Sequence, residues 1–212
     1  MSIDSVTVGD LAEERRRHTM IERSEARDHF LRCLDSEGSG PCVLFVTAPG
    51  GTGKTVCLRL FAALAQERGV ATTWVDMRDV PADARSAEQR FAEALADLAG
   101  ARRGVIFLDT FEAHQGLARH YHERILLMAP KTVRVVLASR QTPELRWRSD
   151  PAWDRLLLEY RLPLMDEAEA TALLTARDVP EGERAALIQL AHGHALTLAC
   201  LATESLEARR RY

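Results

Sequence analysis

The sequence predicts a three-layer α/β fold, in which helices cover both faces of a parallel β-sheet, followed by a small helical subdomain. Short apolar runs alternate with segments of helical periodicity over residues 20–163, and this alternation is typical of a parallel sheet. From Asp166 onward the pattern is helical throughout. We therefore expect an N-terminal lead-in (1–19), an α/β domain (20–163) and a helical subdomain (164–212).

The strands of the expected sheet are short apolar runs bounded by turn residues or acids. They are predicted at residues 43–46, 71–75, 105–109, 133–137 and 158–162. Helices are predicted at 24–34 with Ser24 as cap, from the first strand's turn to Gly69, from a cap at Ser86 to Gly100, and at about 116–128. The lead-in is loose or helical. In the subdomain, Asp166 caps a helix over 167–176, Pro180 begins the next, and Gly193 precedes the last.

Composition excludes several classes of protein. Apolar residues make up 46% of the 212 residues and charged residues 28%, as in an ordinary globular protein. A net charge of −3 gives no reason to expect a nucleic-acid surface. No apolar run is long enough to span a membrane, and the N-terminal residues lack a signal-peptide core. The four cysteines lack metal-ligand spacing, and Cys42 and Cys57 lie in apolar strand and helix patterns, so we expect buried free thiols there and a cytoplasmic protein.

The strongest motif is the stretch Ala48–Thr55, which reads Ala-Pro-Gly-Gly-Thr-Gly-Lys-Thr between a strand and a helix. Its glycines let backbone N–H groups surround a phosphate at the start of the helix. Lys54 would reach the β- and γ-phosphates, and the Thr55 hydroxyl would ligate Mg²⁺. The predicted phosphate-loop contacts are Pro49, Gly50, Gly51, Thr52, Gly53, Lys54, Thr55 and Val56. Ala48 replaces the usual first glycine, and the alternative is a Gly/Pro turn that merely precedes a helix.

We expect Asp109 to hold the same Mg²⁺ ion as Thr55. Asp109 follows four apolar residues at the carboxyl end of a strand. Because the carboxyl ends of parallel strands meet at one edge of the sheet, Asp109 and the phosphate loop can share a ligand. The sequence therefore predicts a triphosphate site that depends on Mg²⁺.

Two further charged residues complete the candidate catalytic set of Lys54, Asp109, Glu112 and Arg140. Glu112 could polarise the attacking water, or it could simply be a glutamate favoured at a helix start. Arg140 follows the fourth strand and could contact the γ-phosphate as a bidentate donor. The alternative for Arg140 is a surface arginine that begins a loop.

The stretches Val105–Glu112, Leu137–Arg140 and Gly193–Leu196 resemble the STAND class of P-loop NTPases, which are related to AAA+ proteins and to NB-ARC and NACHT switches. Ile21–Glu25 resembles the Gly-Arg-Glu motif of that class, with Glu22 in place of its glycine. The resemblance implies that Arg23 and Ala195 lie near the adenine, although Ala195 replaces a proline. It also implies the ASCE strand order, with the Asp109 strand inserted beside the phosphate-loop strand.

The resemblance implies a regulatory switch that binds ATP or ADP with Mg²⁺, hydrolyses ATP slowly and belongs to a signalling or transcription-regulating protein. A protein partner or self-assembly is expected, whereas a nucleic acid or a membrane is not. Members of the class usually continue into further domains, so the chain is expected to be a fragment or a reduced form. Two alternatives stay open: a small-molecule or nucleotide kinase with Arg146-Trp147-Arg148 as its lid, and an interaction module with a vestigial nucleotide site.

Overall fold

The computed structural model describes residues 7–36 and 40–210. The chain forms two compact units. One unit, called the sheet unit below, is Ser24–Pro163. The other, the helical unit, combines residues 7–23 with 164–210, so the N-terminal segment belongs with the C-terminal helices.

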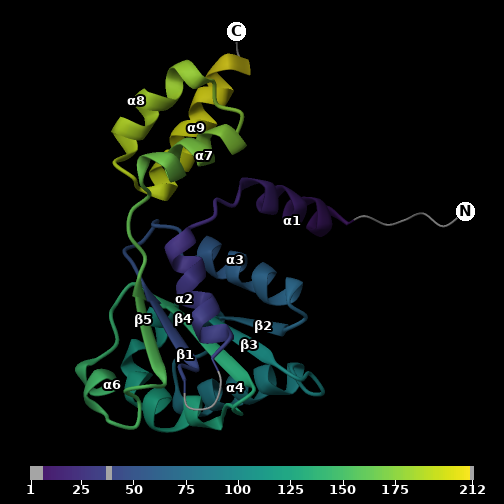
Figure 1. The fold of residues 1–212 in the computed structure, drawn as a ribbon, viewed down its shortest axis with the longest axis vertical. Coiled ribbons are helices and arrows are strands. Elements are labelled where there is room, and N and C mark those ends of the chain that lie inside the picture. Colours follow the sequence, from purple (N-terminus) through teal and green to yellow (C-terminus); the bar gives the residue numbers. More distant parts are fainter. Residues whose placement is uncertain (1–6, 37–39, 211–212) are drawn as a thin grey trace, which may run out of the picture. The chain divides into compact units, whose positions relative to one another are not determined.

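The sheet unit contains one five-stranded sheet in which every neighbouring pair is parallel, and this confirms the predicted fold class (Figure 1). The strands are β1 (Val43–Thr47), β2 (Ala71–Asp76), β3 (Gly104–Asp109), β4 (Val133–Ser139) and β5 (Leu157–Arg161). Their order is β2-β3-β4-β1-β5.

The expectation that the Asp109 strand lies directly beside the phosphate-loop strand is wrong, because β4 lies between β3 and β1. The burial of each strand agrees with this strand order. The residues of β1 and β3 are all buried and those of β4 nearly all, which suits strands with a neighbour on each side. Most residues of β2 and β5 are only half-buried, which suits the two edges.

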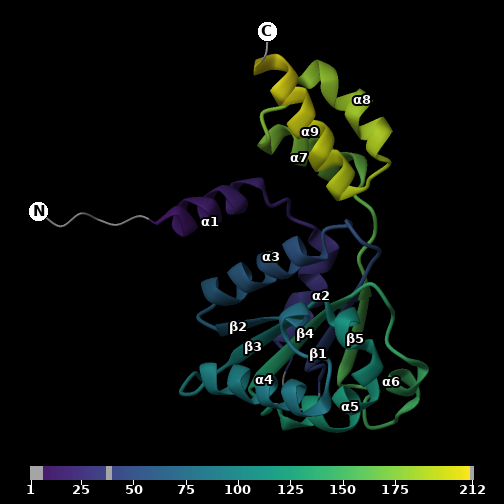
Figure 2. The same ribbon diagram turned by 180° about the vertical axis from the view of Figure 1, so that it is seen from behind.

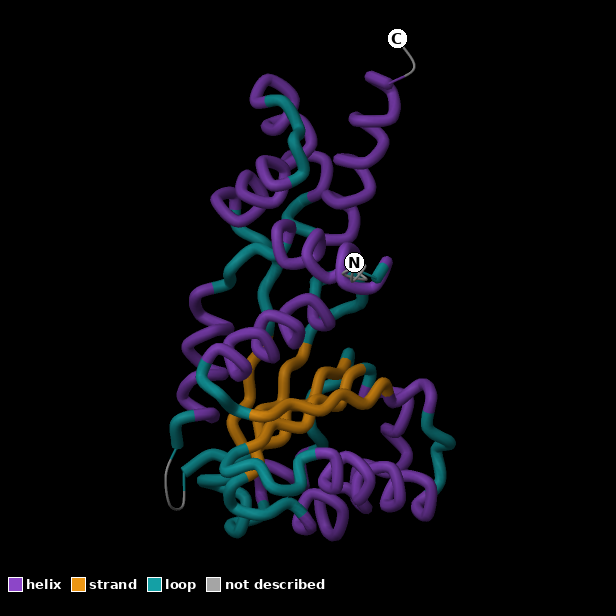
Figure 3. The backbone as a smooth tube through the Cα atoms, turned by 90° about the vertical axis from the view of Figure 1, so that its right-hand side faces the viewer, coloured by secondary structure: helices purple, strands orange, loops and turns teal. Residues whose placement is uncertain are grey.

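Helices cover both faces of this sheet, as the edge-on view in Figure 3 shows. On one face lie α2 (Ser24–Leu34) and α3 (Lys54–Glu67), which pack on Leu44 and Val46. On the other face lies α4 (Ala84–Asp97), in the cluster that contains Phe45. Successive residues of β1 thus enter opposite cores, as the two-residue period of a strand requires.

Two helix predictions need correction in detail. Asp83, not Ser86, caps α4, and its carboxylate accepts the backbone N–H of Ser86 at 2.9 Å. The segment predicted as one helix at 116–128 begins earlier and changes type along its length. It runs as a 3₁₀ helix (Phe111–Leu117), α5 (Ala118–His120), a π-helical turn (Tyr121–Ile125) and a 3₁₀ turn (Leu126–Met128). Two short helices, a 3₁₀ turn at Met77–Asp79 and α6 (Leu145–Ser149), complete this unit.

The helical unit contains α1 (Val8–Thr19), α7 (Glu167–Ala176), α8 (Glu181–Ala191) and α9 (Ala195–Arg210), which Figure 2 shows from behind. Asp166 caps α7 as predicted, in a capping box with Glu169. Gly193 separates α8 from α9 in a left-handed conformation, with φ +75°. Leu173, Leu174 and Leu198 are in its small core. No helix within the described residues is long and apolar enough to cross a membrane.

Candidate functional site

The phosphate loop joins the end of β1 to the start of α3. Gly51 and Gly53 have φ of +74° and +104°, a region that glycine enters without strain, so the loop needs glycine at both places. Thr52 is buried and donates from its hydroxyl to the Pro49 carbonyl at 3.0 Å. Ala48 is buried, and its backbone N–H bonds the Ser139 carbonyl at 3.2 Å. Its methyl group is therefore accommodated where the motif usually has glycine.

Lys54 is buried at the first position of α3, and its ammonium group folds back on the loop. Nζ donates to the carbonyls of Ala48 at 2.7 Å and Pro49 at 3.0 Å. Burial lowers the pKa of Lys54, and the charges of Glu112 and Asp109 oppose this effect only in part. A phosphate anion beside Lys54 would favour the charged ammonium form and so offset the effect of burial on its pKa.

Asp109 and Thr55, predicted as the two Mg²⁺ ligands, lie together although 54 positions separate them. The Thr55 hydroxyl donates to Asp109 Oδ2 at 2.8 Å, and the backbone N–H of Thr110 donates to Oδ1 at 2.9 Å. The Asp109 side chain is almost fully buried, and this burial raises its pKa despite the two hydrogen bonds. A carboxylate and a hydroxyl are oxygen donors of the kind Mg²⁺ prefers, and a cation would offset the buried charge. These residues therefore fit the metal.

Glu112 and Arg140 contact each other at the same edge of the sheet. Arg140 Nε lies 2.9 Å from Glu112 Oε1, and the Arg140 backbone N–H donates to Oε2 at 3.1 Å. The guanidinium also lies beside Gly50: a methyl group added at Gly50 would be 3.5 Å from Cζ. The structure thus brings Arg140 to the phosphate loop and engages Glu112 with it.

Sequence reasoning gave no role to two polar residues at this edge. Asp76 ends β2 in register with Asp109, and its charge contributes to the raised pKa of Asp109. Arg78 binds the Asp76 carboxylate through Nε and Nη2, which neutralises it. Ser139 ends β4 in register with Thr47 and is fully buried. The signal for both was a polar residue that closes an apolar run, as in Asp109.

The residues predicted on the adenine side, Arg23 and Ala195, belong to the helical unit. Arg23 is buried and binds Glu169 through Nε at 3.1 Å and Nη2 at 3.0 Å, and it donates to the Leu164 carbonyl at 3.0 Å. Ala195 is the first residue of α9. Their role toward a nucleotide stays a prediction, as does that of Val56, which is exposed on the first turn of α3.

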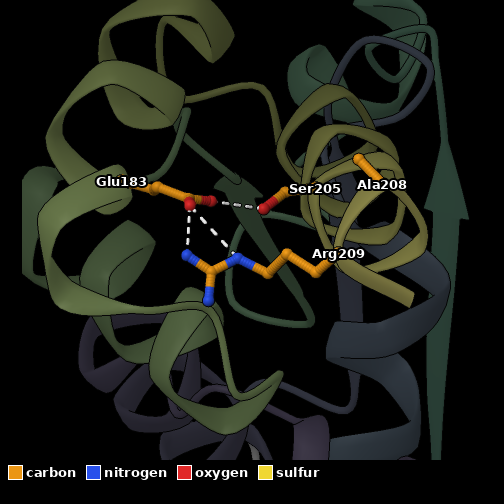
Figure 4. Close-up of a pocket in the computed structure, with 4 residues that line it drawn as sticks. All are labelled: Glu183, Ser205, Ala208 and Arg209. Carbon is orange, nitrogen blue, oxygen red and sulfur yellow. Dashed lines mark hydrogen bonds and ion pairs between the residues drawn. The ribbon is translucent and has the colours of Figure 1, made fainter. Parts of the chain in front are cut away.

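The helical unit also contains a pocket, lined by Glu183, Ser205, Ala208 and Arg209 (Figure 4). The Glu183 carboxylate accepts from the Ser205 hydroxyl and is bound by Arg209. None of the predicted site residues lines this pocket.

The arginines proposed as a kinase lid are engaged in ion pairs. Arg146 Nη1 lies 3.0 Å from Glu123, and Arg148 Nη2 lies 2.5 Å from Glu159. Trp147 between them is buried.

No family model and no curated protein matches this sequence. Solved structures do match. The RuvB Holliday junction branch migration motor of Thermotoga maritima aligns at a TM-score of 0.57 and 14% identity, over 86% of this chain and 61% of RuvB. ORC1 of Aeropyrum pernix, solved in complex with DNA, aligns at 0.53 and 20% identity, over 98% of this chain and 62% of ORC1. ORC2 of the same organism, solved with ADPNP and ADP, aligns at a TM-score of 0.56 and 15% identity, over 98% of this chain and 65% of ORC2.

These neighbours are AAA+ P-loop ATPases, and at such low identity the likeness concerns the fold. This chain spans about three fifths of the length of RuvB and ORC1. The chain has the three-layer α/β fold of AAA+ P-loop ATPases.

Proposed function

We propose that the chain is a regulatory switch module that binds ATP and ADP with Mg²⁺ and hydrolyses ATP slowly. The observation that carries this proposal is the bond between the Thr55 hydroxyl and the buried Asp109 carboxylate, at the start of the phosphate-loop helix. Burial raises the pKa of this acid beside the phosphate loop, and a bound cation would favour its charged form. The resemblance to the STAND class favours a switch over a motor.

Each residue of the site has a role in this proposal. The backbone of residues 49–53 surrounds the phosphates, and Lys54 exchanges its loop carbonyls for phosphate oxygens. Thr55 and Asp109 hold Mg²⁺, which when bound neutralises charge on the phosphates. Arg140 contacts the γ-phosphate and loses this contact when only ADP is bound.

The proposal extends to a protein partner or self-assembly and to the cytoplasm as location. The cysteines within the described residues are free thiols, which suits a reducing compartment. ORC1 was solved in complex with DNA, but the net charge of −3 gives no reason to extend DNA binding to this chain. The kinase alternative is not favoured, because the arginines of its lid are paired with Glu123 and Glu159.

The proposal is tested by Lys54→Ala with Lys131→Ala as control, since Lys54 and Lys131 are the two lysines of the chain. Titration with a fluorescent ATP analogue should show about a 100-fold loss of affinity in Lys54→Ala, because charge-assisted bonds to the phosphates are lost. Lys131→Ala should bind as the wild type does, because its side chain is exposed in the turn before β4. Unchanged affinity in Lys54→Ala would overturn the proposal.

Two assays separate the alternatives. Release of free phosphate distinguishes an ATPase from a kinase, which would phosphorylate a candidate acceptor instead. A thermal scan with millimolar Mg-ATP or Mg-ADP should raise the midpoint if nucleotide binds the folded chain. No shift with either nucleotide would favour an interaction module with a vestigial site.

A further inference from the structure

Glu112 contacts Arg140 at two points that have different consequences. Its Oε2 accepts the backbone N–H of Arg140 at 3.1 Å and so fixes where the chain leaves β4. Its Oε1 lies 2.9 Å from Nε and so fixes the direction of the guanidinium. The Glu112 side chain is only 17% exposed, whereas that of Arg140 is 64% exposed. The glutamate is therefore the fixed partner, and the arginine is the group it holds.

The pairing leaves the outer end of the guanidinium available. Glu112 takes Nε and the backbone N–H, while Nη1 and Nη2 make no hydrogen bond to another residue that the structure describes. Nη1 lies beside the phosphate loop, 3.7 Å from where a methyl group on Gly50 would be. Terminal guanidinium nitrogens in a rigid fork match a phosphate oxygen pair.

The chain reaches Glu112 through a strained turn. Thr110 has φ 59° and ψ 40°, a left-handed conformation that is costly for a β-branched residue. The next residue, Phe111, is buried and packs edge-to-face on Phe45 and Tyr121. The turn reverses the chain after Asp109, and Phe111 anchors it, so Glu112 has a defined position one residue further on.

We propose that Glu112 is a positioning residue, which holds Arg140 with its outer nitrogens directed to the terminal phosphate and thereby sets the preference for a nucleoside triphosphate over a diphosphate. This inference rests on the proposed function, and it assigns Glu112 to nucleotide discrimination in place of water activation. An unrestrained arginine loses more side-chain entropy on binding a phosphate than one already held in place. Removing Glu112 therefore weakens the contact to the γ-phosphate and leaves the α- and β-phosphate contacts intact.

The test is calorimetric titration of the full chain with ADPNP and with ADP, in the wild type, Glu112→Gln, Arg140→Gln and the double variant. The glutamine has the same shape, but one of its two terminal groups is an NH₂ donor, so it cannot accept at both of the positions where the carboxylate oxygens do. We expect the ratio of ADPNP to ADP affinity to fall about fivefold in each single variant. The double variant should show no further fall, because both substitutions remove one interaction.

A matched control breaks a Glu–Arg pair of similar type elsewhere in the sheet unit. Glu123 binds Arg119 and Arg146 at 2.9 and 3.0 Å on the surface, and Glu123→Gln should leave the ratio unchanged. If Glu112→Gln keeps the wild-type ratio while Arg140→Gln lowers it, the inference is wrong and the proposed function stands. Wild-type ratio with lost phosphate release in Glu112→Gln would assign the glutamate to water activation instead. Absence of binding of either nucleotide to the wild type would overturn both.

Discussion

Buried charged side chains have different partners in the two units of this molecule. In the helical unit, Arg23 is buried but matched, since Glu169 binds both Nε and Nη2 and the Leu164 carbonyl accepts another bond. In the sheet unit, Lys54 and Asp109 are buried with pKa values shifted toward their neutral forms, because burial outweighs their partners. An ion pair such as that of Arg23 with Glu169 stabilises the fold, whereas a buried charge with a pKa shifted toward its neutral form is one that a ligand of opposite charge would stabilise.

Arg23 is also one of the residues predicted to lie near the adenine. Its contacts join the segment before α2 to α7 within the helical unit, and this gives the residue a structural reason to be there. The prediction that it also frames the base needs a separate test. Lys54 and Asp109 also make local hydrogen bonds, but burial disfavours the charged form of each and shifts its pKa accordingly.

The largest effect is expected from breaking the helical unit at Gly193. Its φ of +75° suits glycine, and a Cβ there would clash with the carbonyl oxygen of Met165, a backbone atom that cannot move aside. Gly193→Ala should destabilise this unit by about 3 kcal/mol. Hydrogen exchange should show lost protection in α7, α8 and α9, with the sheet amides still protected.

Gly104→Ala in the sheet unit is the control for Gly193→Ala. A Cβ at Gly104 would meet Leu98 Cδ1 at 2.7 Å, which is the far end of a flexible side chain. The cost should be about 1 kcal/mol, because Leu98 can change rotamer. Equal losses in the two variants would contradict the distinction between a backbone clash and a side-chain clash.

A smaller effect, of opposite sign, is expected from Asp109→Asn. The folded-state pKa of Asp109 is raised by burial, so its protonated form favours folding, and this contribution is lost as the pH rises through that pKa. At neutral pH, Asp109→Asn should therefore raise the free energy of unfolding. The gain should disappear below the ordinary pKa of an aspartate. Nucleotide binding should persist in part but lose its dependence on Mg²⁺.

In Asp83→Ala, the free energy of unfolding should depend on pH in the opposite direction. The backbone N–H of Ser86 donates to the Asp83 carboxylate and lowers its pKa, so this residue contributes stability above its ordinary pKa and loses it as the pH falls. Asp83→Ala should destabilise the chain at neutral pH and less so in acid. Urea unfolding at several pH values measures both variants, and slopes of the same sign would contradict the assignment.

Local pattern was enough to predict the fold and to name residues that lie together at the phosphate loop. The phosphate loop and Asp109 are readable because each follows an apolar strand, and the parallel arrangement alone brings them together. The place of β4 between β3 and β1 was not readable, because chain order does not determine which strand is inserted. The Glu112–Arg140 pair was not readable either, since it depends on the left-handed turn at Thr110, which no sequence pattern indicates.

The smallest effect on stability is expected from a substitution at Thr110, the residue of the left-handed turn after β3. Thr110→Gly removes the strain of a φ of 59° but adds freedom to the unfolded chain, so the free energy of unfolding should change by less than about 1 kcal/mol. The same change loosens the position of Glu112, and the ratio of ADPNP to ADP affinity should fall about twofold. Asp178→Gly relieves a similar φ, of 60°, in the helical unit and should leave that ratio unchanged. A loss of discrimination in both variants would mean that strain relief anywhere weakens binding; a loss confined to Thr110→Gly would tie the strained turn to the phosphate site.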